Sequence, residues 1–532
     1  MSNKKSLALL LLVIFAATSL LSGCGSKSGD NNTIRMVIAD PKTLDPRRVG
    51  ESEGIIINDQ VQEGLTNTND ATDAVPAGAE KWEANADATV WTFHLRKDAK
   101  WSNGEPVTAK DYVYSWTTAV APDFANDRTE DFYDIKNAEQ YNKGECKVED
   151  VGVKAIDDYT LQVTLKAPRS YFPLVVAGAS MKPVSAKVCQ VNPKAYQDPK
   201  TMVFNGPFKI ASFTHNSKYE LVRNDQYWDK ANVKPEKILF QVSDDAASQL
   251  SMFRSGQTDY ISQYPSSETI KLMKEEFVKP RPKNGVYYYI FNVKKKPFDN
   301  KKVRQALTLA INRQQIIDNA LQSGQKPALA EIPFGNPDAA PGSDFRTVGG
   351  NYYKDNDIAT AKKLLAEAGY PDGKGFPEIT IKYNTSEGHK KIAEIIQEMW
   401  KDNLNIKVKL VNEEWKVFLM SLGSHDFEVA RMGGIAGVPD ASTFFDGMLP
   451  GGGSNYGAWE NPKFTATYNQ ARVEPDNSKR IALIHESENI FMDDMVHMPI
   501  YFYVNAPAIA KNLKGIVSDS MLNIYLKGAY KE

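Results

Sequence analysis

The sequence predicts an α/β protein of two or three domains, and three observations lead to this prediction. The chain has 532 residues, more than one ordinary hydrophobic core accommodates. From about residue 74 to about residue 180, most segments alternate apolar and polar side chains, which is typical of strands. From about residue 285 onward, strand patterns and helix patterns alternate, which favours βαβ units on a sheet.

The segment 91–116 is the clearest local signal in the chain. Apolar residues at 91, 93 and 95 alternate with polar ones, the period of a strand with one buried face. Asn103-Gly104 predicts a turn because both residues tolerate positive φ. Thr108 followed by Asp111 resembles a capping box and predicts a helix that carries Trp116. We expect a strand, a turn and a helix that bury the tryptophans at 91, 101 and 116 as scaffold.

The same patterns predict further elements along the chain. The expected strands are 34–38, 152–156, 160–165, 219–223, 237–242, 379–383 and 406–411. The expected helices are 55–65, 246–255, 303–312, 357–368 and 389–400. Residues 500–504 form a late apolar strand, which we expect to return to an earlier domain.

The amino terminus predicts export and lipid attachment. Lys4 and Lys5 precede an apolar run at 7–21, which is shorter than the roughly 20 residues of a spanning helix and is typical of a secretion signal. Residues 21–24, Leu-Ser-Gly-Cys, match a lipobox, in which Cys24 is acylated and becomes the new amino terminus. A Gly/Ser/Asn-rich tether follows. We expect an extracytoplasmic protein anchored to the cell membrane through Cys24, facing the periplasm or the cell-wall space.

Composition and motifs exclude several classes of function. The formal net charge is −2, so no basic excess exists to neutralise nucleic-acid phosphates. The sequence contains no nucleophile elbow, P-loop, dinucleotide-binding fingerprint or ligand-spaced His/Cys cluster, so we expect neither an enzyme, nor a metal site, nor a cofactor. Beyond the leader only Cys146 and Cys189 remain, and their spacing leaves open whether they pair.

A set of binding residues lies in the βαβ region. His389 begins a helix just after the carboxyl end of a strand, where ligands collect in open sheets. Arg431 precedes Gly433-Gly434, so a cation adjoins backbone that another chain can approach. Trp415 is a candidate wall of a pocket. An isolated Arg is usually a surface residue and an isolated Trp usually core, so these residues alone support an exported, tethered binding protein or hydrolase.

Long collinear segments resemble one known family. Besides 91–116 they include 151–165 (VGVKAIDDYTLQVTL), 205–209 (NGPFK), 296–313 (KPFDNKKVRQALTLAINR), 383–389, 408–419 and 499–505. The chain is similar over these segments to bacterial solute-binding protein family 5, the extracytoplasmic oligopeptide-binding lipoproteins of peptide ABC transporters. The resemblance implies a periplasmic binding protein type II-like fold, in which two lobes joined by a hinge close over the ligand.

The resemblance also implies a division into three domains, of which I and III form the lobes and II is an added, mostly-β module. After a signal peptide (1–23) and a lipid-anchored tether (24–32), the expected segments are 33–62, 181–284 and 505–532 for domain I, 63–180 for domain II, and 285–504 for domain III.

The same resemblance implies roles for individual residues. His389 and Arg431 fall on positions that engage the carboxylate of a bound peptide, and Trp415 falls on a pocket-wall position. Gly433 and Ile435 fall on positions that contact the peptide main chain, which is held in an extended conformation. These residues form the expected ligand site.

One departure from the family pattern concerns the amino end of the ligand. Family peptide binders carry an Asp that pairs with the α-ammonium of the ligand, and Gly437 stands at that position here. Gly434 stands where the family has Trp. Burying an ammonium without its carboxylate costs several kcal/mol. Either Asp440 substitutes as the carboxylate, or the ligand lacks a free amino terminus at that position.

We therefore expect a membrane-tethered, monomeric receptor that captures oligopeptides and delivers them to an ABC permease, with the ATPase subunits as indirect partners. The alternative within the same fold is a non-peptide or amino-terminally blocked solute, such as a metallophore, a sugar, or an acylated or cyclic peptide. From other classes, a secreted hydrolase and an extracellular chaperone stay open at this point.

Overall fold

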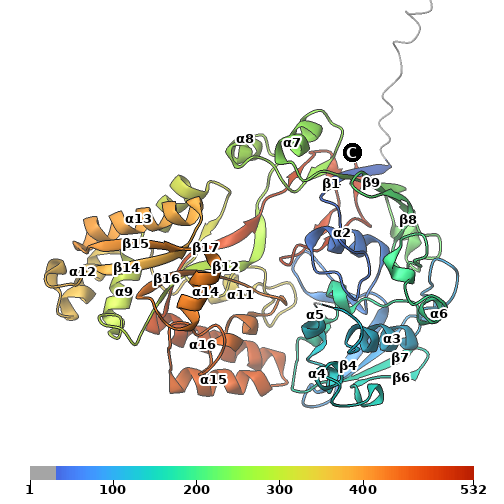
Figure 1. Cartoon of the computed structure of the whole chain (residues 1–532), viewed down its shortest axis with the longest axis horizontal. Helices are drawn as coiled ribbons and strands as arrows, with labels where there is room; N and C mark the ends of the chain where they lie inside the picture. Colours follow the sequence, from blue (N-terminus) through green and yellow to red (C-terminus); the bar gives the residue numbers. More distant parts are fainter. Residues whose placement is uncertain (1–31, 127) are drawn as a thin grey trace, which may run out of the picture.

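The computed structural model describes residues 32–126 and 128–532, which form two lobes set apart from one another (Figure 1). One lobe carries β1, α2 and the helices labelled α3 to α6, and the other carries β14 to β16 and the helices α9, α12, α13 and α16. Strands β12 and β17 run from the second lobe toward the first. The predicted lipid-attachment residue Cys24 lies outside the described residues.

The first lobe is built on a six-stranded sheet in the order β18-β11-β1-β10-β9-β8. Its strands are β1 (Thr33–Ile38), β8 (Phe208–Thr214), β9 (Lys218–Arg223), β10 (Lys237–Val242), β11 (Tyr260–Ile261) and β18 (Ala508–Ile509). The apolar strand β1 lies between β10 and β11, parallel to both, and is almost fully buried. Helix α2 (Ser52–Val61) contributes Ile57 and Val61 to the core that surrounds β1.

A second, antiparallel sheet in the same lobe has the order β4-β5-β7-β6. Its strands are β4 (Ala79–Ala84), β5 (Val90–Leu95), β6 (Val153–Asp157) and β7 (Thr160–Thr164). Helix α3 (Ala109–Ala119) begins at a capping box in which the Asp111 carboxylate accepts the Thr108 backbone N–H at 2.8 Å. The predicted strand, turn and helix are thus confirmed, and the tryptophans at 91, 101 and 116 are buried, as expected of scaffold residues.

The second lobe is built on a six-stranded sheet in the order β13-β17-β12-β16-β14-β15. Its strands are β12 (Arg281–Phe291), β13 (Lys326–Pro327), β14 (Ile379–Asn384), β15 (Val408–Glu413), β16 (Val429–Ile435) and β17 (His497–Asn505). Its main helices are α9 (Lys301–Leu309), α12 (Ile358–Glu367), α13 (Glu387–Leu404), α14 (Trp415–Gly423), α15 (Pro462–Val473) and α16 (Asn477–Asp494). The predicted alternation of strands and helices is confirmed over 379–413.

Strand β12 shows why this sheet is buried on both faces. Tyr287 and Tyr289 lie in one hydrophobic core, with residues of α9, α12 and α13. Val286 and Tyr288 lie in a different core, with residues of α14. Because side chains alternate between the faces of a strand, helices on both faces require a nearly continuous apolar run, which residues 286–291 supply.

Two segments connect the lobes. The chain passes from α8 (Thr269–Lys274) of the first lobe into β12, and it returns from β17 into β18. Strand β17 pairs with β12 and β13 of the second lobe, so the expectation that residues 500–504 return to an earlier domain is wrong. The chain returns to the first lobe after this strand, at residues 506–507. The apolar pattern correctly predicted a buried strand. It could not predict which sheet the strand joins, because backbone hydrogen bonds determine this and they do not depend on the pattern of side chains.

The remaining elements are short. The short helices are α4 (Ala138–Asn142), α5 (Phe172–Val175), α6 (Ala186–Val191), α7 (Ala246–Arg254), α10 (Arg313–Ile316) and α11 (Phe345–Gly349). The short strands are β2 (Thr66–Thr68), β3 (Ala74–Pro76), β19 (Leu513–Lys514), β20 (Val517–Ser518), β21 (Ile524–Tyr525) and β22 (Tyr530–Lys531). Cys146 and Cys189 are both free, so the pairing left open by their spacing is absent. The domain boundaries stay predictions.

Candidate functional site

Arg431 is a buried cation without a counter-ion in the described part of the chain. It lies in β16 opposite Tyr289 of β12 and is 9% exposed. Its Nη1 donates to the Asn384 side-chain oxygen at 3.1 Å, and its Nη2 lies 3.4 Å from the Tyr503 hydroxyl. Its Nε has no hydrogen-bond partner. No carboxylate of residues 32–126 and 128–532 lies within ion-pair distance of this guanidinium.

Other buried arginines show what is missing at Arg431. Arg47, Arg313, Arg346 and Arg480 each contact a carboxylate at 2.6 to 2.7 Å. Arg304 is also buried, and it donates instead to the backbone carbonyls of Phe298 and Asp494 through Nε, Nη1 and Nη2, whereas the Nε of Arg431 has no acceptor. An uncompensated buried charge costs several kcal/mol, so a protein keeps one only where something else neutralises it. Arg431 is therefore a candidate site for an anionic group of a ligand.

Aromatic rings hold the guanidinium in place. Its central carbon lies 4.4 Å from the centroid of the Tyr287 ring, within cation–π range. Tyr287 stacks on Tyr501 with centroids 4.7 Å apart, and Tyr501 meets the ring of Tyr503 edge-on. Burial raises the pKa of Tyr287 to about 12, so this ring stays neutral. Sequence reasoning missed these tyrosines, although their alternate spacing at 287, 289, 501 and 503 was visible.

His389 adjoins the same ring. It is the third residue of α13, and its Nδ1 lies 3.1 Å from the Tyr287 hydroxyl. Burial and the nearby Arg431 cation lower the pKa of His389 to about 4. The imidazole is therefore neutral near pH 7. If Tyr287 donates to Nδ1, the ring proton sits on Nε2 and provides a second donor near the guanidinium.

The backbone edge of β16 beside Arg431 is unpaired. On one side β16 pairs with β12 along its whole length, from Val429 to Ile435. On the other side β14 pairs with it only at Val429 and Ala430. The stretch 431–435 therefore presents N–H and C=O groups along an open edge, the arrangement to which an extended peptide adds as another strand. The cation and the open edge belong to the same strand.

The glycines of this strand have different surroundings. A Cβ on Gly433 would lie 2.6 Å from the Tyr503 hydroxyl, so the glycine makes room for the tyrosine that contacts Arg431. A Cβ on Gly434 would meet only Tyr288 and Phe444, at ordinary contact distances. Ile435, at the end of the strand, is 59% exposed.

Trp415 and Asp440 differ in how accessible they are to a ligand. Trp415 begins α14, is 42% exposed and stacks on Phe418. Asp440 is buried, and its two oxygens accept from Arg480 at 2.9 and 2.7 Å. Burial favours the neutral acid, but Arg480 outweighs it and holds the pKa of Asp440 below its usual range. Because Arg480 already neutralises this carboxylate, Asp440 is a poor candidate for binding the ammonium group of a ligand.

A cavity of about 430 Å³ lies between the lobes next to the end of β16. Residues 435–439 of the second lobe line it, together with residues 49–50, 174–175 and 177–181 of the first. Ile435, which was predicted to contact the ligand, and Gly437, which stands where the family has Asp, both line this space between the lobes.

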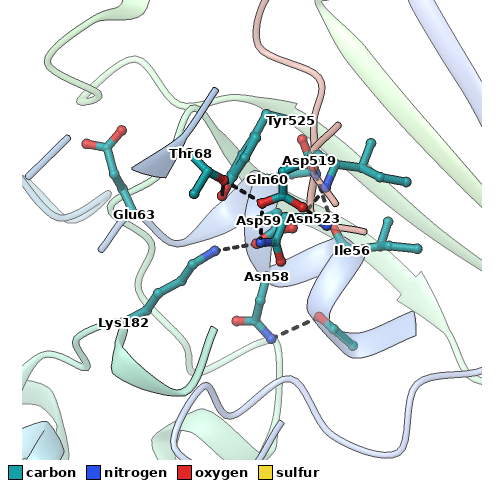
Figure 2. A network of polar contacts seen from close by, with 12 residues as sticks. Ile56, Asn58, Asp59, Gln60, Glu63, Thr68, Lys182, Asp519, Asn523 and Tyr525 are labelled. Carbon is teal, nitrogen blue, oxygen red and sulfur yellow. Dashed lines mark hydrogen bonds and ion pairs between the residues drawn. The ribbon is translucent and has the colours of Figure 1, made fainter. Parts of the chain in front are cut away.

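A buried polar network stiffens the first lobe near this cavity (Figure 2). Lys182 binds Asp59 of α2 at 2.7 Å, and the second oxygen of Asp59 accepts the backbone N–H of Ile524 at 3.2 Å. The carboxylate of Asp519 accepts from Thr68 at 2.6 Å and from the Asn523 side chain at 2.7 Å. The network ties α2 to the carboxyl-terminal segment, two parts far apart in sequence.

A fold of two hinged lobes, with a buried cation and an open strand edge beside the space between them, defines a protein that closes around a solute. Comparison with known proteins agrees: residues 73–456 match the profile described as bacterial extracellular solute-binding proteins, family 5 Middle. The chain belongs to this family. Because its members are binding proteins, it is not an enzyme. Within the described part of the chain, no helix is both long and apolar enough to cross a membrane.

Individual relatives and solved structures are similar to this chain over nearly their whole length. The oligopeptide-binding protein OppA of Bacillus subtilis is 36% identical over the full length of both chains. The unliganded open form of the murein tripeptide binding protein MppA superposes with a TM-score of 0.87 at 30% identity, covering 94% of this chain and 97% of that one. Haemophilus influenzae OppA in complex with the peptide RPPGFSPFR gives 0.63 at 31% identity, covering 94% and 99%. At nearly equal identity the higher score belongs to the open form, so the arrangement of the two lobes is more similar to that of the open receptor.

Proposed function

We propose that this chain is the receptor subunit of an ABC importer, which captures oligopeptides between its lobes and delivers them to a membrane permease. The observation that carries the proposal is Arg431, a buried cation without a counter-ion, at the start of an open strand edge. A peptide supplies both missing partners, a terminal carboxylate for the guanidinium and a backbone for the edge.

The peptide-binding relatives support this ligand class. Closure needs no chemical step, because a ligand that binds the closed arrangement better than the open one shifts the equilibrium between them. His389 assists at the carboxylate, Trp415 borders a side-chain pocket, and Gly433 and Ile435 offer main-chain contacts. Asp440 is left out of this site because Arg480 occupies its carboxylate.

The cellular setting completes the proposal. Cys24 attaches the mature chain to the cell membrane by lipid, with the receptor, a monomer, facing the extracytoplasmic side. The permease and, through it, the ATPase subunits are its partners. Replacing Cys24 with Ala should release the protein from the membrane fraction, and retention of the variant there would contradict the anchor.

The ligand class is tested with one pool of random tetrapeptides in two forms, with free and with amidated carboxyl ends. Native mass spectrometry of the purified protein should show complexes with the free-acid pool and at least tenfold fewer with the amidated pool. Equal binding of both pools would contradict the role of Arg431. Binding of neither pool would favour the alternative of a non-peptide solute.

A further inference from the structure

The carboxyl-terminal end of β16 determines the surroundings of the amino end of a peptide whose carboxylate is bound at Arg431. Strand residues rise about 3.3 Å each, so Ile435 lies roughly 13 Å along the strand from Arg431. Residues 435–439 then line the interlobe cavity. A peptide anchored at Arg431 and extended along this edge brings its other end to the cavity after about four residues. The chemistry of the cavity therefore selects that end.

The cavity holds no free anion for an ammonium group. Of the described residues that line it, only Arg128 and Asp131 are charged. Their side chains pair with each other, Nη2 to carboxylate at 2.9 Å and Nε to carboxylate at 3.1 Å. The rest of the lining is apolar or neutral.

Carboxylates outside the lining mostly have other partners. Asp440 binds Arg480, and Asp519 accepts from Thr68 and Asn523. Glu51 accepts the backbone N–H of Lys42 at 3.0 Å. Glu53, in the first turn of α2, makes no ion pair in the described part of the chain but does not line the cavity.

Gly437 leaves room at this end of the strand. A Cβ built on Gly437 would meet nothing within 4 Å, and the backbone there is not in the left-handed region. A side chain would therefore fit at position 437, but the residue there is glycine.

We propose that this receptor does not recognise the amino end of its ligand as an ammonium, and that it accepts peptides whose amino end is blocked or extended. The inference rests on the proposed function and concerns the opposite end of the same ligand. An acyl group or a further peptide unit enters the neutral, largely apolar cavity without leaving a buried anion unpaired. A free ammonium meets no unpaired anion among the described residues that line this cavity.

The wild-type protein tests this with the tetrapeptide pool in three forms: unmodified, amino-acetylated, and carboxyl-amidated. Acetylation should change the dissociation constant less than about threefold, whereas amidation should raise it more than tenfold. Weakening by acetylation of tenfold or more, with amidation also harmful, would overturn this inference and leave the proposed function intact. Equal binding of the amidated pool would remove the anchor at Arg431 and overturn this inference, although the protein would still bind peptides. Binding of no pool would overturn both the inference and the proposed function.

Two variants sharpen the test. Gly437→Asp adds the missing carboxylate, and Gly437→Asn adds the same shape without the charge. The Asp variant should prefer the unmodified pool over the acetylated pool at least tenfold, and the Asn variant should show no preference. If neither variant discriminates while both keep the wild-type melting temperature, the amino end does not lie at Gly437 and the inference fails. If the wild type discriminates and Glu53→Gln abolishes this, Glu53 is the ammonium acceptor and the inference is overturned.

Discussion

The guanidinium of Arg431 lies over the ring of Tyr287, 4.4 Å from its centroid, while the hydroxyl of that ring lies 3.1 Å from His389 Nδ1. One tyrosine thus links the two residues that the sequence pointed to separately. Because Tyr287 stays neutral, it orients the cation without neutralising it. The unpaired charge stays available to a ligand.

Replacing Arg431 with Ala should lower peptide affinity more than tenfold and leave the melting temperature of the ligand-free protein nearly unchanged or slightly higher. The reason is that the side chain contributes a buried, uncompensated charge, which binds ligand but does not stabilise the empty protein. Calorimetric titration and thermal unfolding measure the two effects. Arg472→Ala, at an exposed position, serves as control. Unaltered affinity in Arg431→Ala would remove Arg431 from the site.

Gly433→Ala should weaken peptide binding by about tenfold, because its Cβ would lie 2.6 Å from the Tyr503 hydroxyl and displace the ring that contacts Arg431. In a Tyr503→Phe background that clash disappears, since the ring carbons lie at 3.5 Å. A double-mutant cycle on affinity should therefore show strong coupling. Gly434→Ala, whose Cβ meets only ordinary contacts, controls for a methyl group on this strand. Additive effects of the two substitutions would refute the steric explanation.

His389 should stay neutral down to about pH 4 in the ligand-free protein. A bound carboxylate should raise its pKa, because a neighbouring anion favours the imidazolium. By linkage, peptide affinity should then rise as the pH falls from 7 toward 5, and His389→Gln should flatten this dependence. Titration of the ring by NMR, with and without peptide, measures the two pKa values. An ordinary pKa in the free protein would contradict the burial argument.

Asp519 should make the first lobe less stable as the pH rises. Burial raises its pKa to about 6, so the folded protein holds a proton that the unfolded chain releases near pH 4. Its stabilising contribution is complete below about pH 4 and is lost as the pH rises through 6, a change of about 3 kcal/mol. Denaturant unfolding of Asp519→Asn should lack this part of the pH dependence. Parallel curves for the wild type and the variant would contradict it.

Asp440 should prove structural. Asp440→Ala leaves Arg480 buried without its partner and should lower the free energy of unfolding by about 3 to 5 kcal/mol. Peptide affinity, measured at a temperature where the variant is folded, should change less than threefold. A large loss of affinity in a protein of wild-type stability would restore Asp440 as a ligand residue.

The sequence predicted local structure well where the signal was local. The strand, turn and helix of 91–116 and the helix at 357–368 follow from side-chain period and capping, and the structure confirms them. Asp357 is the N-cap of this helix, and its carboxylate accepts the backbone N–H of Thr360 at 3.2 Å. The strand at 500–504 was correctly predicted but assigned to the wrong sheet.

What the sequence alone determined is therefore the class of element in segments with a clear local pattern, the absence of a basic excess, and, through long collinear motifs, the family. Only the tertiary structure decided that Arg431 lacks a counter-ion while Asp440 has one, and that β14 leaves 431–435 unpaired. The physical reason is that charge compensation and strand pairing depend on atoms far apart in the chain. The residue types show which groups are able to interact, but only the folded chain brings the interacting groups close to one another.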